Sequence, residues 1–231
     1  MNAPLPAWTD RLEEIRARIA FAAQRSGRRP DDVVLVGVVK QVPLERVREA
    51  VSLGLRDLGE NRVQEAREAV AAIGRNAARW HMIGHLQRNK VGRALELFDR
   101  IHGVDDLELA AALSQRALGL GRTVPVLVEV NVSGESSKFG VRPDALEPLL
   151  ERVAGMPGLA LDGLMTVGAP VAEPEAARAG FATLRRLRDA AEAAIGRKLP
   201  ELSMGMSGDF EVAVEEGATL VRVGTALFGE R

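Results

Sequence analysis

The sequence predicts an α/β protein built as a single (β/α)8 TIM barrel. Short apolar strands alternate with longer amphipathic helices along the chain, and no Pro-, Gly- or Ser-rich linker divides them. With 46% hydrophobic and 27% charged residues, the 231-residue sequence has enough apolar side chains for a large core. A barrel of this length is routinely one domain, so residues 1–231 are expected to form one.

The first elements establish the order of strand and helix. Asp10 and Glu13 resemble a capping box, which predicts a helix that starts there and ends near Gly27. The apolar, β-branched run from Val33 to Lys40 is typical of a strand that is buried on both faces. A helix is expected next, from Pro43 to Leu53.

Further strands are predicted at Arg56–Asn61, Arg79–Gly84, Arg100–Asp105, Val124–Val132, Leu159–Val167, Glu201–Met206 and Thr219–Gly224. Helical segments separate them, most clearly Leu107–Leu118 and Glu173–Ile195. Strict alternation predicts a parallel sheet, and a total of eight strands favours a closed barrel. A doubly wound open sheet has the same alternation and stays open as the competing fold.

Composition excludes several classes of function. Cysteine is absent, so disulfides, thiolate nucleophiles and thiolate metal sites are excluded, and no metal site is expected. The net charge of -1 does not fit a nucleic-acid binder. No signal peptide or membrane-spanning run is evident, so we expect a cytoplasmic protein without a membrane partner. A monomer is expected, since bare barrels with an internal site can be monomers.

Lysine is scarce, and this makes Lys40 a candidate for amine chemistry. Of 31 Lys and Arg residues only four are lysines, so arginine supplies nearly all the positive charge. Arginine stays protonated, whereas a partly desolvated lysine can lose its proton and attack a carbonyl. Lys40 closes an apolar strand, where it either forms a Schiff base with an aldehyde or makes a structural ion pair.

The loops after the last two predicted strands suit a phosphate. In (β/α)8 barrels these loops and a short helix that follows often hold a phosphate group. Ser207 follows one strand, and Gly224 and Thr225 follow the other where a short helix is expected. Backbone N–H groups and two hydroxyls would converge there, although Ser and Thr are also ordinary helix caps. Together with Lys40, they favour a phosphorylated aldehyde as the ligand.

Arg222 alternates with Val221 and Val223, so its side chain is expected to point into the barrel. It either joins a core ion pair or donates to the pyridine nitrogen of pyridoxal 5′-phosphate (PLP). Because arginine keeps its proton, a pyridine paired with it stays unprotonated and is a weak electron sink. Such a site would hold the cofactor without strongly activating it.

The chain resembles the pyridoxal phosphate homeostasis protein family, single-domain PLP barrels related to the N-terminal domain of alanine racemase (PLP fold type III). The matching segments are VGVVK at Lys40, LGENRVQE, WHMIGHLQRNK, IHGVD, VNVSGESSKFG, GLMT and SMGMSGDFEVAVEEGATLVRVGTALFG. The resemblance covers nearly the whole chain. It implies PLP attached covalently to Lys40 and its phosphate at Ser207, Gly224 and Thr225. It further implies Arg222 at the ring nitrogen, with Asn61 and His81 lining the pocket.

Some positions depart from the family pattern. Members usually carry Ser and Thr around the lysine, where this chain has Val39 and Gln41. The position of His85 is often Pro, and Phe139 replaces a residue that is usually small and polar. The departures around Lys40 bear on the fine positioning of the cofactor and not on its attachment.

The resemblance implies a protein that buffers PLP or delivers it to apo-enzymes that use it, without classical turnover and hence without catalytic residues. Tyrosine is absent, which excludes two-base racemisation by a tyrosine. Two alternatives stay open. One is a PLP enzyme acting on an unidentified amino acid, whose carboxylate Arg88 or Lys90 would bind. The other is a cofactor-free Schiff-base aldolase that uses Lys40 on a sugar phosphate.

Overall fold

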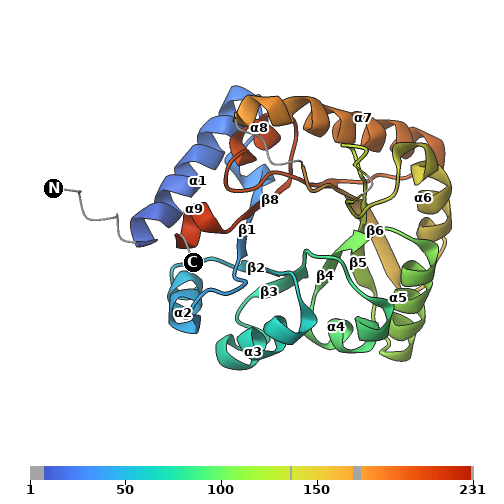
Figure 1. Ribbon diagram of the computed structural model, residues 1–231, viewed down its shortest axis with the longest axis horizontal. Helices are drawn as coiled ribbons and strands as arrows, with labels where there is room; N and C mark the ends of the chain where they lie inside the picture. Colours follow the sequence, from blue (N-terminus) through green and yellow to red (C-terminus); the bar gives the residue numbers. More distant parts are fainter. Residues whose placement is uncertain (1–7, 136, 169–172, 230–231) are drawn as a thin grey trace.

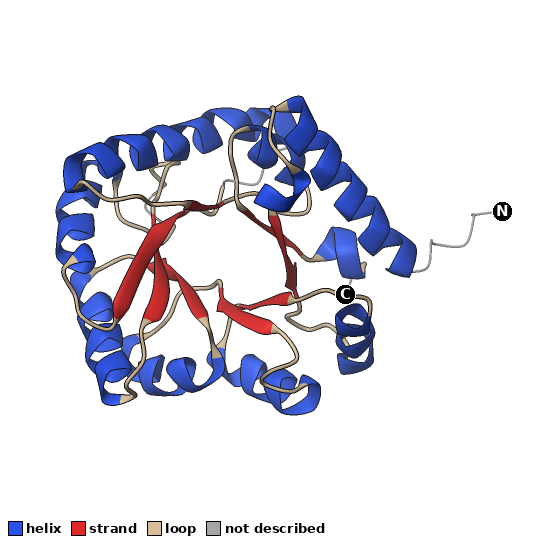
Figure 2. Ribbon diagram, turned by 180° about the vertical axis from the view of Figure 1, so that it is seen from behind, coloured by secondary structure: helices blue, strands red, loops and turns tan. Residues whose placement is uncertain are grey.

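In the computed structural model, which describes residues 8–135, 137–168 and 173–229, parallel strands form a closed barrel inside a ring of helices (Figures 1 and 2). The strands lie in chain order around the barrel: β1 (Val34–Val38), β2 (Asp57–Glu60), β3 (Arg79–Met82), β4 (Arg100–Val104), β5 (Val124–Glu129), β6 (Leu159–Met165), β7 (Glu201–Ser203) and β8 (Leu220–Val223). The (β/α)8 prediction is therefore confirmed.

Pairing of the first strand with the last closes the barrel. Val36 of β1 lies opposite Arg222 of β8, and Gly37 lies opposite Val223, both in parallel register. An open doubly wound sheet would leave β1 or β8 without this neighbour, so that alternative is wrong. Figure 1 shows β1 beside β8.

The α-helices pack around the barrel: α1 (Trp8–Arg25), α2 (Leu44–Ser52), α3 (Val63–Ile73), α4 (Val91–Leu97), α5 (Leu107–Gly119), α6 (Leu146–Ala154), α7 (Arg178–Ile195), α8 (Phe210–Glu215) and α9 (Thr225–Phe228). Short 3-10 helices are η1 (Pro30–Asp32), η2 (Arg88–Lys90), η3 (Pro143–Ala145) and η4 (Pro174–Ala177). The capping-box prediction is wrong, because α1 is already helical at Trp8 and Asp10 lies in its first turn. There the carboxylate faces the positive end of the helix dipole.

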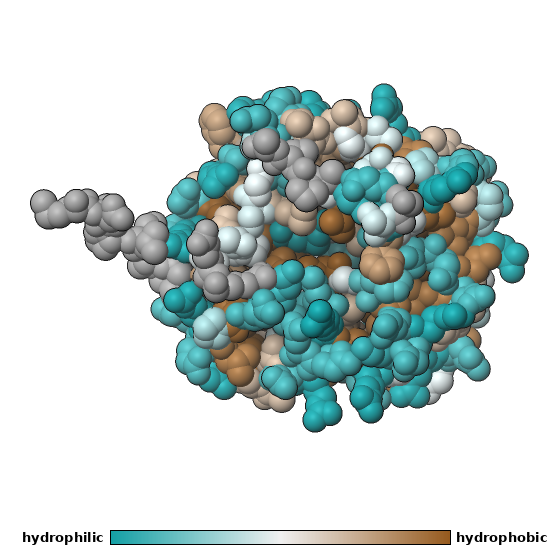
Figure 3. All heavy atoms as spheres, viewed as in Figure 1, coloured by the Kyte–Doolittle hydropathy of each residue, from teal (hydrophilic) through white to brown (hydrophobic). Residues whose placement is uncertain are grey.

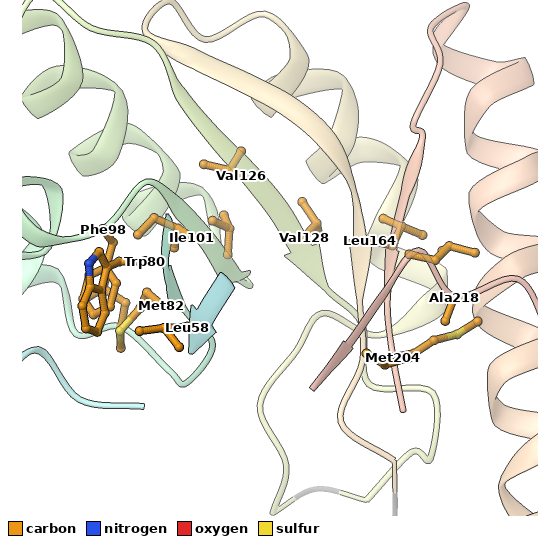
Figure 4. Close-up of a cluster of buried hydrophobic side chains, with 14 of the residues drawn as sticks. Leu58, Trp80, Met82, Phe98, Ile101, Val126, Val128, Leu164, Met204 and Ala218 are labelled. Carbon is orange, nitrogen blue, oxygen red and sulfur yellow. The ribbon is translucent and has the colours of Figure 1, made fainter. Parts of the chain in front are cut away.

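Two layers of buried side chains hold the fold together. The larger layer lies between strands and helices and includes Trp80, Phe98 and Ile101, as the close-up in Figure 4 shows. Burying each such side chain contributes about 1.5–3 kcal/mol. Inside the barrel the apolar cluster is small, consisting of Val36, Leu127, Met165 and Leu220 with Val34 packed against it. Polar side chains occupy much of the remaining interior.

Outside the barrel, hydrophilic residues cover most of the face in Figure 3, and apolar residues show in smaller areas between them. This is the distribution expected of a helix ring whose polar sides face water. Among the described residues, no helix is long and apolar enough to cross a membrane.

Candidate cofactor site

Lys40 lies just beyond the end of β1, at the mouth where all strands end. Its side chain is partly buried, while Val39 before it is buried in the core and donates its N–H to the Gly59 carbonyl at 3.0 Å. Gln41 after it has φ 57°, a left-handed conformation that non-glycine residues adopt at a cost. The backbone on both sides of Lys40 is therefore held in one conformation, which restricts the directions that the lysine side chain can take.

The phosphate prediction rests on Ser207 and the start of α9. The Ser207 hydroxyl oxygen accepts hydrogen bonds from the backbone N–H groups of Gly224 and Ala226, each at 3.2 Å. The side chain of Thr225 is exposed at the first position of α9. A hydroxyl and two N–H groups thus gather at one point next to the end of β1, and such a donor set suits a phosphate dianion.

Arg222 points into the barrel, as predicted. Its Nη1 donates to the Ser203 hydroxyl oxygen at 2.6 Å, and its Nη2 donates to the Thr166 carbonyl oxygen at 2.8 Å. Burial lowers the pKa of Arg222 to about 10, against the opposing effects of Glu129 and Asp209. The guanidinium therefore keeps its proton at neutral pH and serves as a fixed donor.

Asn61 follows β2 at the same mouth, where Gly84 packs against its backbone. A Cβ on Gly84 would lie 2.6 Å from the Asn61 carbonyl oxygen, so only glycine fits there. Asn61 lines a hollow of about 310 Å³ together with His85 and Lys90. Asn61 therefore borders a hollow formed by the segments that follow β2 and β3.

His81 lies deeper than the resemblance implies. It is buried in β3, with Nε2 2.9 Å from Asp57 Oδ1 and Nδ1 2.9 Å from His102 Nε2. Both ring nitrogens are therefore engaged inside the barrel, and the structure does not bring His81 to the mouth with Lys40. Its connection to the site runs through other side chains.

Two carboxylates face the barrel interior near the mouth. Burial and the neighbouring charge of Asp105 together raise the pKa of Glu129 to about 7, against the lowering effect of Arg222. Burial also raises the pKa of Asp105, whose Oδ2 lies 3.5 Å from His85 Nδ1. Glu129 is therefore a proton donor or acceptor near neutral pH within the candidate site.

The loop after β5 is organised by Asn131. Its Oδ1 accepts from the Gly134 N–H at 3.0 Å, and its Nδ2 donates to the Glu135 carbonyl at 2.8 Å. Lys138 in this loop pairs with Glu135 at 3.0 Å, and the Phe139 ring stacks on that of His85. The loop is thus linked to the loop after β3, across the mouth from Lys40.

The two residues proposed to bind an amino-acid carboxylate both belong to η2 but have different surroundings. Arg88 is exposed and pairs with Glu108. Lys90 is partly buried and lines the hollow beside Asn61. Lys90 therefore lies near Asn61, but the residues that line this hollow do not include Lys40 or Ser207.

Sequence reasoning missed Asp57, His102, Ser203 and Glu129. Each is a buried polar residue that lies in a strand of the barrel. Such a residue needs a polar partner, since an unpaired buried polar group is costly. That pattern is the signal that could have identified them.

The donor set fits PLP and not a metal. It comprises one lysine amine, a group of N–H and hydroxyl donors suited to a phosphate, and a buried guanidinium suited to a neutral ring nitrogen. Among the residues that the structure describes, no three His, Cys, Asp or Glu side chains are grouped to hold a metal ion.

Comparisons with known proteins agree with this arrangement. The family model described as alanine racemase, N-terminal domain, matches residues 11–231. A protein of Aquifex aeolicus named pyridoxal phosphate homeostasis protein is 44% identical over 222 residues, covering 96% of this chain and 97% of the relative. One of the same name from Pseudomonas aeruginosa is 47% identical, covering 96% of this chain and 95% of the relative.

Comparison with solved structures shows that the similarity includes the fold. PipY of Synechococcus elongatus, solved with PLP bound, superposes with a TM-score of 0.85 at 36% identity, covering 96% of this chain and all (100%) of PipY. Alanine racemase of Clostridium difficile shares the fold alone, with a TM-score of 0.75 at 17% identity, covering 96% of this chain and 57% of the racemase. The chain therefore belongs to the alanine racemase N-terminal domain family and, within it, to the pyridoxal phosphate homeostasis proteins.

Proposed function

We propose that this protein binds PLP covalently through the amine of Lys40 and acts in PLP homeostasis or delivery. The observation that supports the proposal is the pairing of β1 with β8, because Lys40 follows β1 and Gly224 of the Ser207–Gly224 donor group follows β8 at the same mouth of the barrel. The PLP bound to PipY, a relative that matches over nearly the whole chain, supports the same ligand.

When bound, PLP supplies an aldehyde, a phosphate and a pyridine ring. Lys40 would take the aldehyde, Ser207 with the N–H groups of Gly224 and Ala226 the phosphate, and Arg222 the ring nitrogen. Thr225, at the start of α9, would add its hydroxyl at the phosphate, and Asn61 would border the pocket. His81 would act on the cofactor indirectly, through the buried side chains to which it is hydrogen-bonded.

An arginine at the pyridine nitrogen favours a protein that binds PLP over an enzyme that uses it for turnover. A carboxylate at this position would protonate the pyridine and strengthen it as an electron sink. Arg222 retains its proton and is anchored to Ser203 and Thr166, so it leaves the pyridine neutral. We therefore propose a carrier that is cytoplasmic and monomeric, whose recipients are apo-enzymes that use PLP.

A reduction experiment tests the attachment. The protein is incubated with PLP, reduced with borohydride and weighed by mass spectrometry, and the modified peptide is identified. The wild type should gain one phosphopyridoxyl group at Lys40, and Lys40→Ala should gain none. Lys198→Ala is the matched control, because Lys198 is 88% exposed and pairs with Glu192 at 3.0 Å on the surface. A wild-type protein without an adduct at Lys40 would overturn the proposal.

A transfer experiment tests the role. Loaded protein is mixed with an apo-enzyme that needs PLP, and recovery of that enzyme's activity is followed against an equal amount of free PLP. Direct transfer predicts recovery that persists when a scavenger removes free PLP. Steady turnover of an amino acid by the loaded protein alone would instead support the alternative of a PLP enzyme.

A further inference from the structure

A continuous hydrogen-bonded series of buried side chains crosses the inside of the barrel and ends on Arg222. We call it the polar network: Asp57, His81, His102, Ser203 and Arg222. Its members come from β2, β3, β4, β7 and β8, and none is more than 5% exposed. The links measure 2.9 Å from Asp57 to His81, 2.9 Å from His81 to His102, 2.9 Å from His102 to Ser203 and 2.6 Å from Ser203 to Arg222.

The Arg222 end determines the direction of the first hydrogen bond and, together with the Asp57 end, the direction of the others. A guanidinium has donors and no acceptor, so Arg222 donates to the Ser203 oxygen. Ser203 then has its own proton to give to His102 Nδ1. His102 accepts there and donates from Nε2 to His81 Nδ1.

The Asp57 end of the network requires the same direction of hydrogen-bond donation. His81 accepts at Nδ1 and donates from Nε2 to Asp57, which also accepts from Arg79 at 2.7 Å. Burial alone would raise the pKa of Asp57, but the hydrogen bonds from His81 and Arg79 outweigh it and lower that pKa. Asp57 is therefore an ionised acceptor, and each link contains one proton.

Asp57 and Arg222 carry charges at the two ends of the network, and His102 between them is neutral. Burial holds the pKa of His102 well below its usual range, and the positive charges nearby add to this. A neutral His102 has one donor and one acceptor nitrogen, which is what its two neighbours require. Breaking any link would leave a buried polar group unsatisfied, and a half-satisfied network is worse than an apolar one.

The network reaches the end of the barrel opposite Lys40. Asp57 and His81 border a hollow of about 160 Å³ together with Arg79 and Arg100. Arg79 is 65% exposed there and holds the outer oxygen of Asp57. The orientation of Arg222 at the mouth is thus tied to an ion pair at the far end.

We propose that His102 and His81 are positioning residues, which orient Ser203 so that its lone pair fixes the Arg222 guanidinium toward the cofactor ring. The inference rests on the proposed function, since it names the ligand that Arg222 faces. It extends that function by assigning roles to buried residues that do not touch the ligand. With Ser203 and the Thr166 carbonyl each taking one terminal nitrogen, the guanidinium plane has a single orientation.

Imidazole nitrogen NMR on the wild type without PLP tests the network directly. The protein has only three histidines, His81, His85 and His102, so single-histidine variants suffice for assignment. In both His81 and His102 the hydrogen-bond geometry predicts a proton on Nε2 and an accepting Nδ1. A proton on Nδ1 of either ring would overturn the proposal, because the network could not then run from Arg222 to Asp57.

Variants test the effect on the cofactor. Ser203→Ala and His102→Phe should weaken PLP binding about 10-fold or more and shift the absorbance band of the bound cofactor. The adduct on Lys40 should still form at high PLP concentration. His102→Gln should recover part of the affinity, because its amide oxygen can accept from Ser203 and its amide nitrogen can donate to His81.

Ser114→Ala is the matched control. Ser114 is also a buried serine, and its hydroxyl donates to the Pro157 carbonyl at 2.6 Å, far from the network. It should bind PLP with wild-type affinity and spectrum. Ser203→Ala with the same affinity and spectrum as Ser114→Ala would overturn the positioning role while leaving the attachment to Lys40 intact. Loss of the adduct in the wild type would instead refute the proposed function.

Discussion

The ring of His85 stacks on the ring of Phe139, with centroids 3.9 Å apart and planes inclined by 9°. His85 follows β3 and Phe139 lies in the loop after β5, so the stack joins two loops that border the mouth. Both are positions at which the sequence is expected to depart from the family pattern. In this chain the two departures contact each other and link the loops.

Replacing Phe139 should loosen this link and speed the release of PLP. An aromatic pair of this geometry contributes about 0.5–1.5 kcal/mol. Phe139→Ser is therefore expected to raise the rate of PLP transfer to an apo-enzyme by about 2- to 10-fold. Phe21→Ser is the matched control, since Phe21 is 59% exposed on α1 and Phe139 is 56% exposed. Equal transfer rates for the two variants would contradict the prediction.

Glu129 should make the stability of the protein depend on pH. Its pKa is raised by burial, then by Asp105, from 4.5 to about 7. The folded protein thus holds this proton more tightly than the unfolded chain does. The free energy of unfolding should therefore fall as pH rises from about 4.5 to about 7, by up to about 3 kcal/mol.

Glu129→Gln removes that dependence, because glutamine has no proton to lose. Urea unfolding at pH 5, 6, 7 and 8 should show the variant gaining stability relative to the wild type as pH rises. Asp105 has a raised pKa too, so some fall with pH should remain in the variant. A constant difference between the two proteins across this range would show that Glu129 is ionised in the folded state throughout.

Gly205, between β7 and the Ser207 loop, should not tolerate a side chain. It has φ 89°, and a Cβ would lie 2.5 Å from the Ala213 Cβ and 3.0 Å from the Phe210 Cα. Gly205→Ala combines backbone strain of about 1–2 kcal/mol with overpacking of about 1–3 kcal/mol. We expect the free energy of unfolding to fall by about 2–5 kcal/mol.

Gly196→Ala separates the two causes. Gly196 ends α7 with φ 62°, and no atom lies within 4 Å of its Cβ position. Only backbone strain applies there, so the expected loss is about 1–2 kcal/mol. Chemical denaturation of both variants measures the difference, and equal losses would mean that α8 moves to accommodate the added methyl group.

Arg222 shows which features a strand pattern predicts and which it does not. Alternation with Val221 and Val223 predicts that it points inward, and the structure confirms this. Its partner Ser203 was not predicted, although it lies on the adjacent strand. The pairing depends on the register of β7 against β8, where Ser203 lies opposite Leu220. Register is a property of the assembled sheet.

A local irregularity also escaped prediction. The register between β4 and β5 shifts between Ile101 and Val104. His102 points into the barrel, where it contacts Ser203. Gly103, the next residue, also faces the interior, and its Cβ position lies 3.2 Å from Glu129 Oε2. A bulge of this kind changes the face that following residues present, so alternation alone assigns them incorrectly.

The sequence by itself determined the strand and helix segments, the inward direction of Arg222, and the place of Lys40 and Ser207 at strand ends. These follow from local periodicity, which each segment contains in full. Only the tertiary structure decided that His81 faces His102, 21 residues away, and that His102 faces Ser203, 101 residues away. The physical reason is that closure and register of the barrel select which inward side chains meet. A polar residue in a strand reveals its need for a partner, and the assembled barrel determines which partner it has.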